Sequence, residues 1–541
     1  MGRIERRSRQ RLLPPAALGG PPAPGANAGT SSRVAAPTDG RRVLGELAIH
    51  RREFLAYACR FATAAVAGGP LLALTRGRRA RAGTPIAELR RTIAAADGAV
   101  LTPDDAGFAL ARRDFNLRID VTPKAIVRCR SSRAVERAVT WAVTNDVPVH
   151  VRAGGHSYEG TSLGEGLVID VRPLDGIAID ERTRTARIGA GARLGACYAA
   201  STARGLAPVA GRCGSVGIAG LTLGGGHGFL VRAFGLACDQ LRSVRLVDAR
   251  GKQITASEKE NAELFWALRG AGCSGFGVVT ELEVALHPVT RVVTWSLGWP
   301  PSDAARVLGA WQDLVPHLPD GAGIFLQLDA AAGRGVVSTS CQGVYIPLRA
   351  DEKPTADTVR ALLRPLVGAV PPVAQTVREE LFRATVPIGG KAPDPVRFKG
   401  KSDILTTLLD PGAIDAVIDA LQHLETGPVA MMLDGYGGAI ARVGADATAF
   451  AHRDALACVQ WYTQWRSPHE TDARLAMMRS LHARVHPHFS GGANVNYCDA
   501  DLADGPRAYF GAHLERLEGL KKAVDPGNRF RSGTIGITRA T

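Results

Sequence analysis

Residues 211–228, with the sequence GRCGSVGIAGLTLGGGHG, contain eight glycines in eighteen positions. A second glycine-rich stretch, RAGGHSYEG, covers residues 152–160. Glycine lets the backbone approach a ligand closely and direct its N–H groups at phosphate oxygens. One such loop alone predicts only a tight turn, but two long ones in one region favour a nucleotide site. Their spacing does not match the G-x-G-x-x-G fingerprint of the common dinucleotide-binding fold.

The residues before the loop at 152–160 predict a strand–helix–strand unit. Residues 125–130 (AIVRCR) and 147–152 (VPVHVR) have the sequences of strands. Between them, the pair Ser131-Ser132 is suited to cap a helix whose apolar positions continue to Ala142. Further strands are predicted at residues 166–171, 185–188, 241–248 and 277–286. This part of the chain, about residues 110–290, is therefore predicted to be an α/β domain.

From about residue 293 the pattern changes. Strand-like runs at residues 292–297 and 336–344 mix with longer helical stretches at residues 357–367 and 411–424. Strands and helices in this arrangement predict a second domain built on an antiparallel sheet.

The composition fits a globular chain of two or three domains, with 541 residues, of which 45% are hydrophobic and 22% charged. The formal net charge of +15 would suggest a nucleic-acid binder. However, residues 1–82 hold 15 of the 66 basic and only 4 of the 51 acidic side chains, so most of the excess lies there. The rest of the chain is nearly balanced, which argues against a nucleic-acid surface on it. The nine cysteines are scattered without C-x-x-C spacing, so they indicate neither a disulfide framework nor a zinc site.

Residues 1–82 have the features of an export leader. Residues 1–45 are rich in Pro, Gly, Ala and Arg, a composition that cannot bury enough apolar surface to order itself. Arg51-Arg52 then precede a mostly apolar run, and Ala80-Arg81-Ala82 provides an A-x-A cleavage site. This combination indicates a twin-arginine export signal. The alternative, a membrane anchor, is disfavoured because the run is only about the minimum spanning length and is interrupted by Arg60.

Twin-arginine export carries folded proteins, and chains that must take up a cofactor in the cytoplasm need this route. The leader therefore predicts a secreted or periplasmic protein that meets a membrane only during export, with a redox cofactor bound before it leaves the cytoplasm.

Further motifs along the chain carry a family resemblance. After the two loops come GLACD at residues 235–239, LFWALRG at 264–270, GFGVVT at 275–280, NYCDADL at 496–502 and DPGNRF at 525–530. With these motifs, residues 110–541 resemble the berberine-bridge-enzyme-like FAD-linked oxidases, of the vanillyl-alcohol-oxidase type. The resemblance implies an α+β fold with a PCMH-type FAD-binding domain at 110–290. It further implies a substrate-binding domain at 291–490, whose antiparallel sheet is covered by helices, and a C-terminal segment at 491–541 that returns to the FAD domain.

The resemblance implies that FAD is bound, and bound covalently at two points. His156 matches the family's attachment to the 8α-methyl group and Cys213 matches the attachment to C6 of the ring. Taken alone, His156 could be a hydrogen-bonding loop residue and Cys213 a buried small side chain. The residues expected to bind the cofactor are Arg152, Gly154, Gly155, His156, Ser157, Cys213, Val216, Gly217, Gly220, Gly226, Val279 and Asn496.

The same resemblance predicts the chemistry. Val216 occupies a position where a small residue accompanies oxidase behaviour. Tyr497 matches the catalytic base of carbohydrate-oxidising relatives, and Tyr158 matches the tyrosine that supports it. A tyrosine serves as a base if neighbours lower its pKa from the unperturbed value of about 10. The alternative role for Tyr497 is packing against the flavin.

We therefore expect a secreted oxidase that transfers a hydride from an alcohol group of a small molecule, a carbohydrate or similar, to FAD and reduces oxygen to hydrogen peroxide. Asn494 stands where the family usually has a further tyrosine that would face the substrate pocket. This departure keeps open an oxidase or dehydrogenase of a secondary metabolite such as a polyketide, alkaloid or amine. A flavin-binding protein without turnover and a nucleic-acid binder using the leader are rivals of another class.

Three weaker candidates have no assigned role in the predicted chemistry. His227 is expected to be a polar loop residue near phosphate, and Tyr436 either lines the pocket or is structural. The cluster His482, His486 and His488 has spacing that could bind a metal, but such a cluster is more often a solvated helix end, and flavin chemistry needs no metal. No metal is therefore expected.

Overall fold

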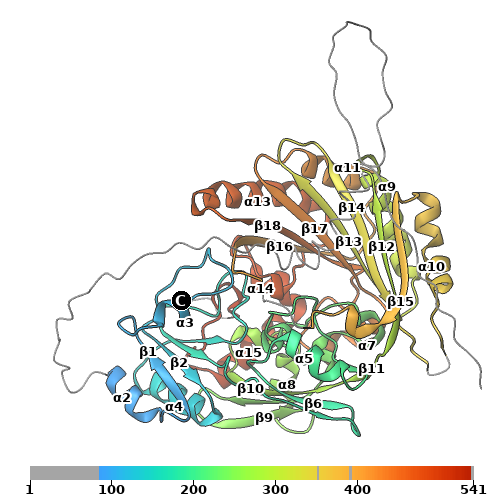
Figure 1. The fold of residues 1–541 in the computed structure, drawn as a ribbon. Helices are drawn as coiled ribbons and strands as arrows, with labels where there is room; N and C mark the ends of the chain where they lie inside the picture. The colour runs from blue at the N-terminus through green and yellow to red at the C-terminus, as the bar shows by residue number, and fades with distance from the viewer. Residues whose placement is uncertain (1–84, 350–351, 389–392, 538–541) are drawn as a thin grey trace, which may run out of the picture. The chain divides into compact units, whose positions relative to one another are not determined.

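The computed structural model describes residues 85–349, 352–388 and 393–537 (Figure 1). The predicted leader at 1–82, with its export signal, lies outside the described residues. Within the described part of the chain, no helix has the length and apolar character needed to cross a membrane.

The predicted strand–helix–strand unit is present near the start of the described chain. Strand β2 (Ala125–Cys129) leads into helix α4 (Ser132–Thr144), and the chain then enters β3 (Val149–Arg152). The Ser131 hydroxyl caps α4 by accepting the Ala134 N–H at 3.2 Å. The two strands are not neighbours, because β4 (Leu167–Asp170) inserts between them and pairs in parallel with both. The sheet is completed by β1 (Gly98–Leu101), which pairs antiparallel with β2.

A second sheet follows, and all of its strands are antiparallel. Its order is β5 (Ile177–Asp180), β6 (Thr185–Gly189), β10 (Val278–Ala285), β8 (Leu241–Val247) and β9 (Gln253–Ser257). Buried residues of both sheets, such as Val127 and Val149 of the first and Val244 and Leu282 of the second, belong to one hydrophobic core. The two glycine-rich loops and the short helix α6 (Ile218–Leu223) are part of this half of the structure.

A seven-stranded antiparallel sheet forms the other half. Its order is β15 (Ala374–Leu381), β12 (Arg291–Trp299), β14 (Val337–Tyr345), β13 (Ala322–Ala331), β17 (Pro428–Gly435), β18 (Ala457–Trp465) and β16 (Arg397–Leu405). Helices cover one of its faces, as Figure 1 shows, and together with the sheet they enclose a second core. These helices are α9 (Ala304–Leu314), α10 (Ala356–Ala369), α11 (Pro411–Gln422) and α13 (Thr471–Val485). The predicted α+β architecture, with an antiparallel sheet covered by helices, is confirmed.

The C-terminal part of the described chain runs back to the first sheet. After α13 the chain forms the 3₁₀ turn η9 (Val495–Tyr497) and the helices α14 (Gly505–Phe510) and α15 (Leu514–Val524). Backbone hydrogen bonds then join the chain to β3, since Val149 N–H donates to Arg529 O at 2.8 Å and Arg531 N–H to Val149 O at 2.8 Å. This return brings Tyr497 to the glycine-rich loops.

Candidate active site

The two glycine-rich loops cross with their backbones in direct contact. A Cβ atom added to Gly217 would lie 2.5 Å from the Gly154 nitrogen, and a Cβ on Gly154 would meet Gly217 in the same way. Gly155 has a φ of 70°, in the region that L side chains rarely adopt. The crossing therefore requires glycine and fixes the spacing between the loops that carry His156 and Cys213.

His156 and Cys213 share a neighbour, Ser215. The His156 imidazole donates a hydrogen bond to the Ser215 backbone carbonyl, and the Cys213 sulfur lies 3.3 Å from the Ser215 hydroxyl. The ring of Phe115 stacks on His156 with 4.1 Å between centroids. Burial, with the charge of Arg193, lowers the pKa of His156 to about 3. The imidazole is therefore neutral near pH 7 and keeps a nucleophilic ring nitrogen.

The surroundings of these loops fit FAD. The hydroxyls of Thr222, on α6, and Ser274, at the end of the 3₁₀ turn η2 (Gly272–Ser274), are buried and have no hydrogen-bond partner within the described residues. Gly220 on the same helix has open space where a side chain would be. Buried hydroxyls without a partner are costly, so polar groups of a ligand would satisfy them. With the neutral imidazole and the glycine crossing, they form a donor set suited to a polar cofactor.

Other residues expected to bind the cofactor support the loops. Arg152 is buried, lies 3.0 Å from Asp114 and donates to the Ala111 and Arg113 carbonyls. The Ser157 hydroxyl accepts the Thr161 N–H at 3.0 Å.

The remaining expected cofactor residues are spread over three elements. Asn496 donates to Leu221 O at 3.0 Å, and its amide occupies the space that a side chain on Gly224 would need. Val279 lies in β10 opposite Leu246. Val216 and Gly226 lie in the second loop, where Val216 N–H donates to Cys213 O at 3.2 Å and Gly226 has a φ of 76°.

A chain of polar groups starts at the Tyr497 hydroxyl. This hydroxyl is hydrogen-bonded to His227 Nε2 at 2.8 Å, and His227 Nδ1 is hydrogen-bonded to the Tyr436 hydroxyl at 2.8 Å. Asp434 Oδ2 lies 3.3 Å from the same His227 Nε2. Arg212 donates to both oxygens of Asp434. The structure therefore makes His227 a partner of the expected base, where the sequence predicted only a polar loop residue.

The pKa of Tyr497 shifts in the direction opposite to the one that a tyrosine base needs. Burial, followed by the charge of Asp434, raises the pKa of Tyr497 well above its ordinary value, although Arg212 opposes this. The described residues therefore do not lower the pKa of Tyr497, which is the condition for a tyrosine to serve as the base. Burial alone would also raise the pKa of Asp434, but Arg212 and His227 outweigh it and hold that pKa well below its usual range. A neutral Tyr497 thus faces an imidazole backed by a carboxylate.

Tyr158 lies beside Tyr497 and contacts it ring to ring. Their ring centroids are 5.3 Å apart, and the Tyr158 hydroxyl accepts a hydrogen bond from Gln460. Phe398 packs edge-on against Tyr158 at 4.9 Å. A side chain at Gly400 would collide with the Tyr158 ring. Tyr158 is therefore held against the seven-stranded sheet and contacts Tyr497 through its ring.

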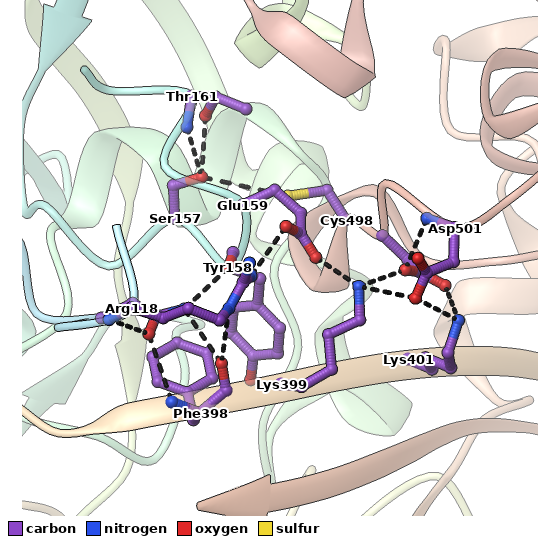
Figure 2. A network of polar contacts seen from close by, with 12 residues as sticks. Arg118, Ser157, Tyr158, Glu159, Thr161, Phe398, Lys399, Lys401, Cys498 and Asp501 are labelled. Carbon is purple, nitrogen blue, oxygen red and sulfur yellow. Dashed lines mark hydrogen bonds and ion pairs between the residues drawn. The ribbon is translucent and has the colours of Figure 1, made fainter. Parts of the chain in front are cut away.

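A buried charge network holds the two tyrosine-bearing segments to β16 (Figure 2). Lys399 Nζ lies 2.5 Å from Glu159, which follows Tyr158, and 2.5 Å from Asp499, two residues after Tyr497. Lys401 Nζ lies 2.6 Å from Asp499. Both lysines are buried, so the network joins the His156 loop, the C-terminal segment and the sheet. Sequence reasoning missed it, because its members are far apart in the chain.

Asn494 has a different role from the expected one. It is 3% exposed, and its side-chain oxygen accepts the Asn496 N–H at 2.9 Å. Its amide nitrogen lies 3.4 Å from the Cys458 sulfur, and its backbone N–H donates to Ser402. Asn494 therefore caps the turn that carries Tyr497, and its amide is engaged inside the protein.

Two segments of the chain match known family models. Residues 123–257 match the FAD binding domain, and residues 493–534 match the family described as berberine and berberine like. The uncharacterized FAD-linked oxidoreductase YgaK of Bacillus subtilis is 32% identical over 443 residues, which is 80% of this chain and 95% of YgaK. The chain belongs to the berberine bridge enzyme-like family of FAD-linked oxidoreductases.

Solved structures of family members have the same fold as this FAD-linked oxidoreductase. Physcomitrella patens BBE-like 1 is 28% identical and has a TM-score of 0.76, with 85% of this chain and 100% of that chain covered. The xylooligosaccharide oxidase from Myceliophthora thermophila C1, solved in complex with xylobiose, is 25% identical and has a TM-score of 0.74. That match covers 84% of this chain and 99% of the oxidase. The oxidoreductase thus carries its His156, Cys213 and Tyr497 on a fold shared across the family.

Proposed function

We propose that this FAD-linked oxidoreductase is an oxidase that removes a hydride from an alcohol group of a small molecule, and that its FAD is bound covalently through His156 and Cys213. The observation that carries the proposal is the hydrogen bond between the Tyr497 hydroxyl and His227, beside the loops that bear His156 and Cys213. FAD, when bound, supplies the hydride acceptor and the electrons that convert oxygen to hydrogen peroxide.

Covalent attachment is supported by the state of the two side chains. The neutral His156 imidazole provides a nucleophilic nitrogen, and Cys213 is half-buried and carries a free thiol. Ser215 contacts both residues and orients them together. The proposed oxidase behaviour rests on Val216, three residues after Cys213, because a small residue at this position accompanies oxidase behaviour in the family.

The proton path runs through Tyr497. Because the Tyr497 phenol is neutral, it cannot take the substrate's hydroxyl proton unless it gives up its own. We assign that proton to His227 Nε2, which lies 2.8 Å from the phenol oxygen; this transfer requires the tautomer in which Nε2 is unprotonated and Nδ1 donates its proton to the Tyr436 hydroxyl. Asp434, held by Arg212, lies 3.3 Å from this nitrogen and stabilises the positive charge that the transfer creates.

Two substrate classes are supported by different observations. The rings of Tyr158, Phe398 and Tyr462 pack together near Tyr497, with Phe398 and Tyr462 at 5.3 Å. Phe398 is buried, whereas Tyr158 and Tyr462 are half-buried, and we infer that the rings of these two tyrosines would contact a sugar ring or an aromatic alcohol. Likeness to the xylooligosaccharide oxidase supports the carbohydrate class. The second candidate, an oxidase of a secondary metabolite such as a polyketide, alkaloid or amine, rests on the absence of the family's further tyrosine at position 494, where this chain has Asn494.

Export through the twin-arginine route, with FAD loaded in the cytoplasm, is part of the same proposal and is supported by Arg51-Arg52 and the A-x-A site. A fractionation experiment with the full chain and with an Arg51→Lys/Arg52→Lys variant tests it. Export of both proteins alike would contradict it.

A substrate panel tests the proposed chemistry. Purified protein is mixed anaerobically with mono- and oligosaccharides, aromatic alcohols and amines, and bleaching of the flavin band is recorded. Admitting air should restore the band and release one peroxide per turnover. A bleached flavin that air does not reoxidise would indicate that the protein is a dehydrogenase and not an oxidase. No bleaching by any class would contradict the alcohol-oxidase proposal.

A further inference from the structure

Asp403, His482 and His486 form a cluster that the flavin chemistry does not use. Asp403 lies on β16, His482 on α13, and His486 begins the 3₁₀ turn η8 (His486–His488) that continues α13. A separation of four residues places the two imidazoles on one helix face. Their rings are stacked with 4.7 Å between centroids. The sequence predicted a solvated helix end here, which is wrong for His482, since this side chain is buried.

The three side chains lie close enough together to share one metal ion. Asp403 Oδ2 lies 3.2 Å from His482 Nε2, and Asp403 Oδ1 lies 2.5 Å from His486 Nδ1. All three ligand atoms lie within 4.8 Å of one another. Zinc bonds of about 2.0–2.2 Å in tetrahedral geometry place ligand atoms about 3.4 Å apart. Small side-chain rotations would therefore bring all three residues onto one ion.

Two features point to a cation at this position. Asp403 is fully buried, and His482 Nε2 faces its Oδ2 without meeting hydrogen-bond geometry. A carboxylate oxygen and an imidazole lone pair repel each other, so at 3.2 Å either a proton, as in a hydrogen bond from His482 to Asp403, or a metal ion lies between them. In addition, Trp461 Nε1 donates to Asp403 Oδ2 at 2.7 Å, the kind of outer contact that orients a metal-binding carboxylate.

The charged residues around this cluster, and its access to solvent, allow a metal ion to bind. Lys401, whose charge acts on His486, is itself paired with Asp499 and Asp501 at 2.6 and 3.1 Å. The His486 side chain is 34% exposed, so an ion can enter from solvent and keep a water as a further ligand. Two imidazoles and one carboxylate suit Zn²⁺ and Co²⁺ better than Ca²⁺ or Mg²⁺, which prefer oxygen ligands only.

We propose that Asp403, His482 and His486 bind one divalent transition-metal ion of the zinc class, which ties α13 to β16. The next residue back along the strand, Ser402, accepts the Asn494 backbone N–H at 2.9 Å. The ion would therefore brace the strand that also holds the C-terminal segment. The proposal stands apart from the proposed oxidase function, because no ligand belongs to the flavin site.

Metal titration of the flavin-loaded protein tests this site. The protein is prepared without a polyhistidine tag, stripped with a chelator at about pH 7.5, and titrated with Co²⁺ by visible absorption and with Zn²⁺ by calorimetry. We expect one ion per chain, a visible band of four- or five-coordinate Co²⁺, and an unfolding midpoint about 2 °C higher with saturating Zn²⁺.

Variants distinguish this site from adventitious binding. His486→Gln should weaken binding roughly 100-fold or more, since it removes a direct ligand. His488→Gln, in the same turn but outside the cluster, should bind like the wild type. The flavin spectrum of each variant reports whether it has folded. Absence of binding at 100 µM metal, or equal binding by His486→Gln and the wild type, would overturn the proposal and leave an ion-paired cluster.

Discussion

Replacing His227 by leucine tests the proton path most sharply. The change removes both ring nitrogens, and with them the 2.8 Å hydrogen bonds to the hydroxyls of Tyr497 and Tyr436. The side chain is 9% exposed, so solvent does not readily replace it. Tyr497 would keep its position on η9 but lose the group proposed to take its proton.

The expected magnitude follows from the lost contact. A hydrogen bond to a group that becomes charged contributes about 1.5–3 kcal/mol. At about 1.4 kcal/mol for each factor of ten, the rate of flavin reduction should fall by roughly 10- to 150-fold. Substrate affinity should change much less, because the proposed role of His227 is to receive a proton.

The assay is anaerobic stopped-flow reduction of the bound flavin, with the best substrate from the panel at saturating concentration. Tyr436→Phe is the matched control, since it removes the other hydrogen bond to His227 and leaves the contact with Tyr497. Its reduction rate should fall by no more than about threefold. Flavin content and the unfolding midpoint show whether each variant is folded. A His227→Leu rate within twofold of the wild type would refute the proton path.

Three other changes address the loops, the charge network and the histidine cluster. Gly217→Ala should prevent stable flavin incorporation, because the added Cβ would lie 2.5 Å from the Gly154 nitrogen. Gly220→Ala is the control, since position 220 has open space and this variant should retain flavin. Equal flavin content of the two variants by absorbance would contradict the close contact between the two loops. Lys399→Met leaves Glu159 paired only with Arg118 and Asp499 paired only with Lys401, and should lower the free energy of unfolding by about 1.5–3 kcal/mol in denaturant titration. Lys399→Arg should recover part of this loss, and an unchanged midpoint for Lys399→Met would exclude a stabilising role for Lys399. The hydrogen bond to Asp403 raises the pKa of His486 in the folded protein. This ion pair therefore stabilises the fold fully below the pKa that His486 has in the unfolded chain, and the stabilisation is lost as the pH rises through the pKa of His486 in the folded protein. In chelator, the difference in unfolding midpoint between wild type and His486→Gln should therefore be larger at about pH 5.5 than at about pH 9, and a constant difference would contradict this ion pair.

Local sequence features predicted much of the fold. The strand at residues 125–130, its serine-capped helix and the strand at 147–152 depend on nearby residues and are present. The sequence did not show that β2 and β3 are separated in the sheet, because β4, which inserts between them, comes from further along the chain.

The polar contacts of the site could not be predicted in the same way. Arg212 pairs with Asp434 across 222 residues, and Lys399 pairs with Glu159 across 240. Such pairs carry no periodicity or turn signal, since the two halves of the structure create them only when folded. Two weak signals existed, because Arg212 precedes Cys213 and Asp434 precedes a Gly-Tyr-Gly-Gly turn.

The covalent state of the flavin tests the central proposal most directly. Holoprotein is precipitated with acid, and the flavin in pellet and supernatant is measured before the pellet is digested and analysed by mass spectrometry. We predict that the flavin stays with the pellet and that one flavin joins the peptide containing His156 to the peptide containing Cys213. In Cys213→Ala the flavin should stay attached to the His156 peptide alone. Recovery of all flavin in the supernatant of the wild type would contradict the proposal.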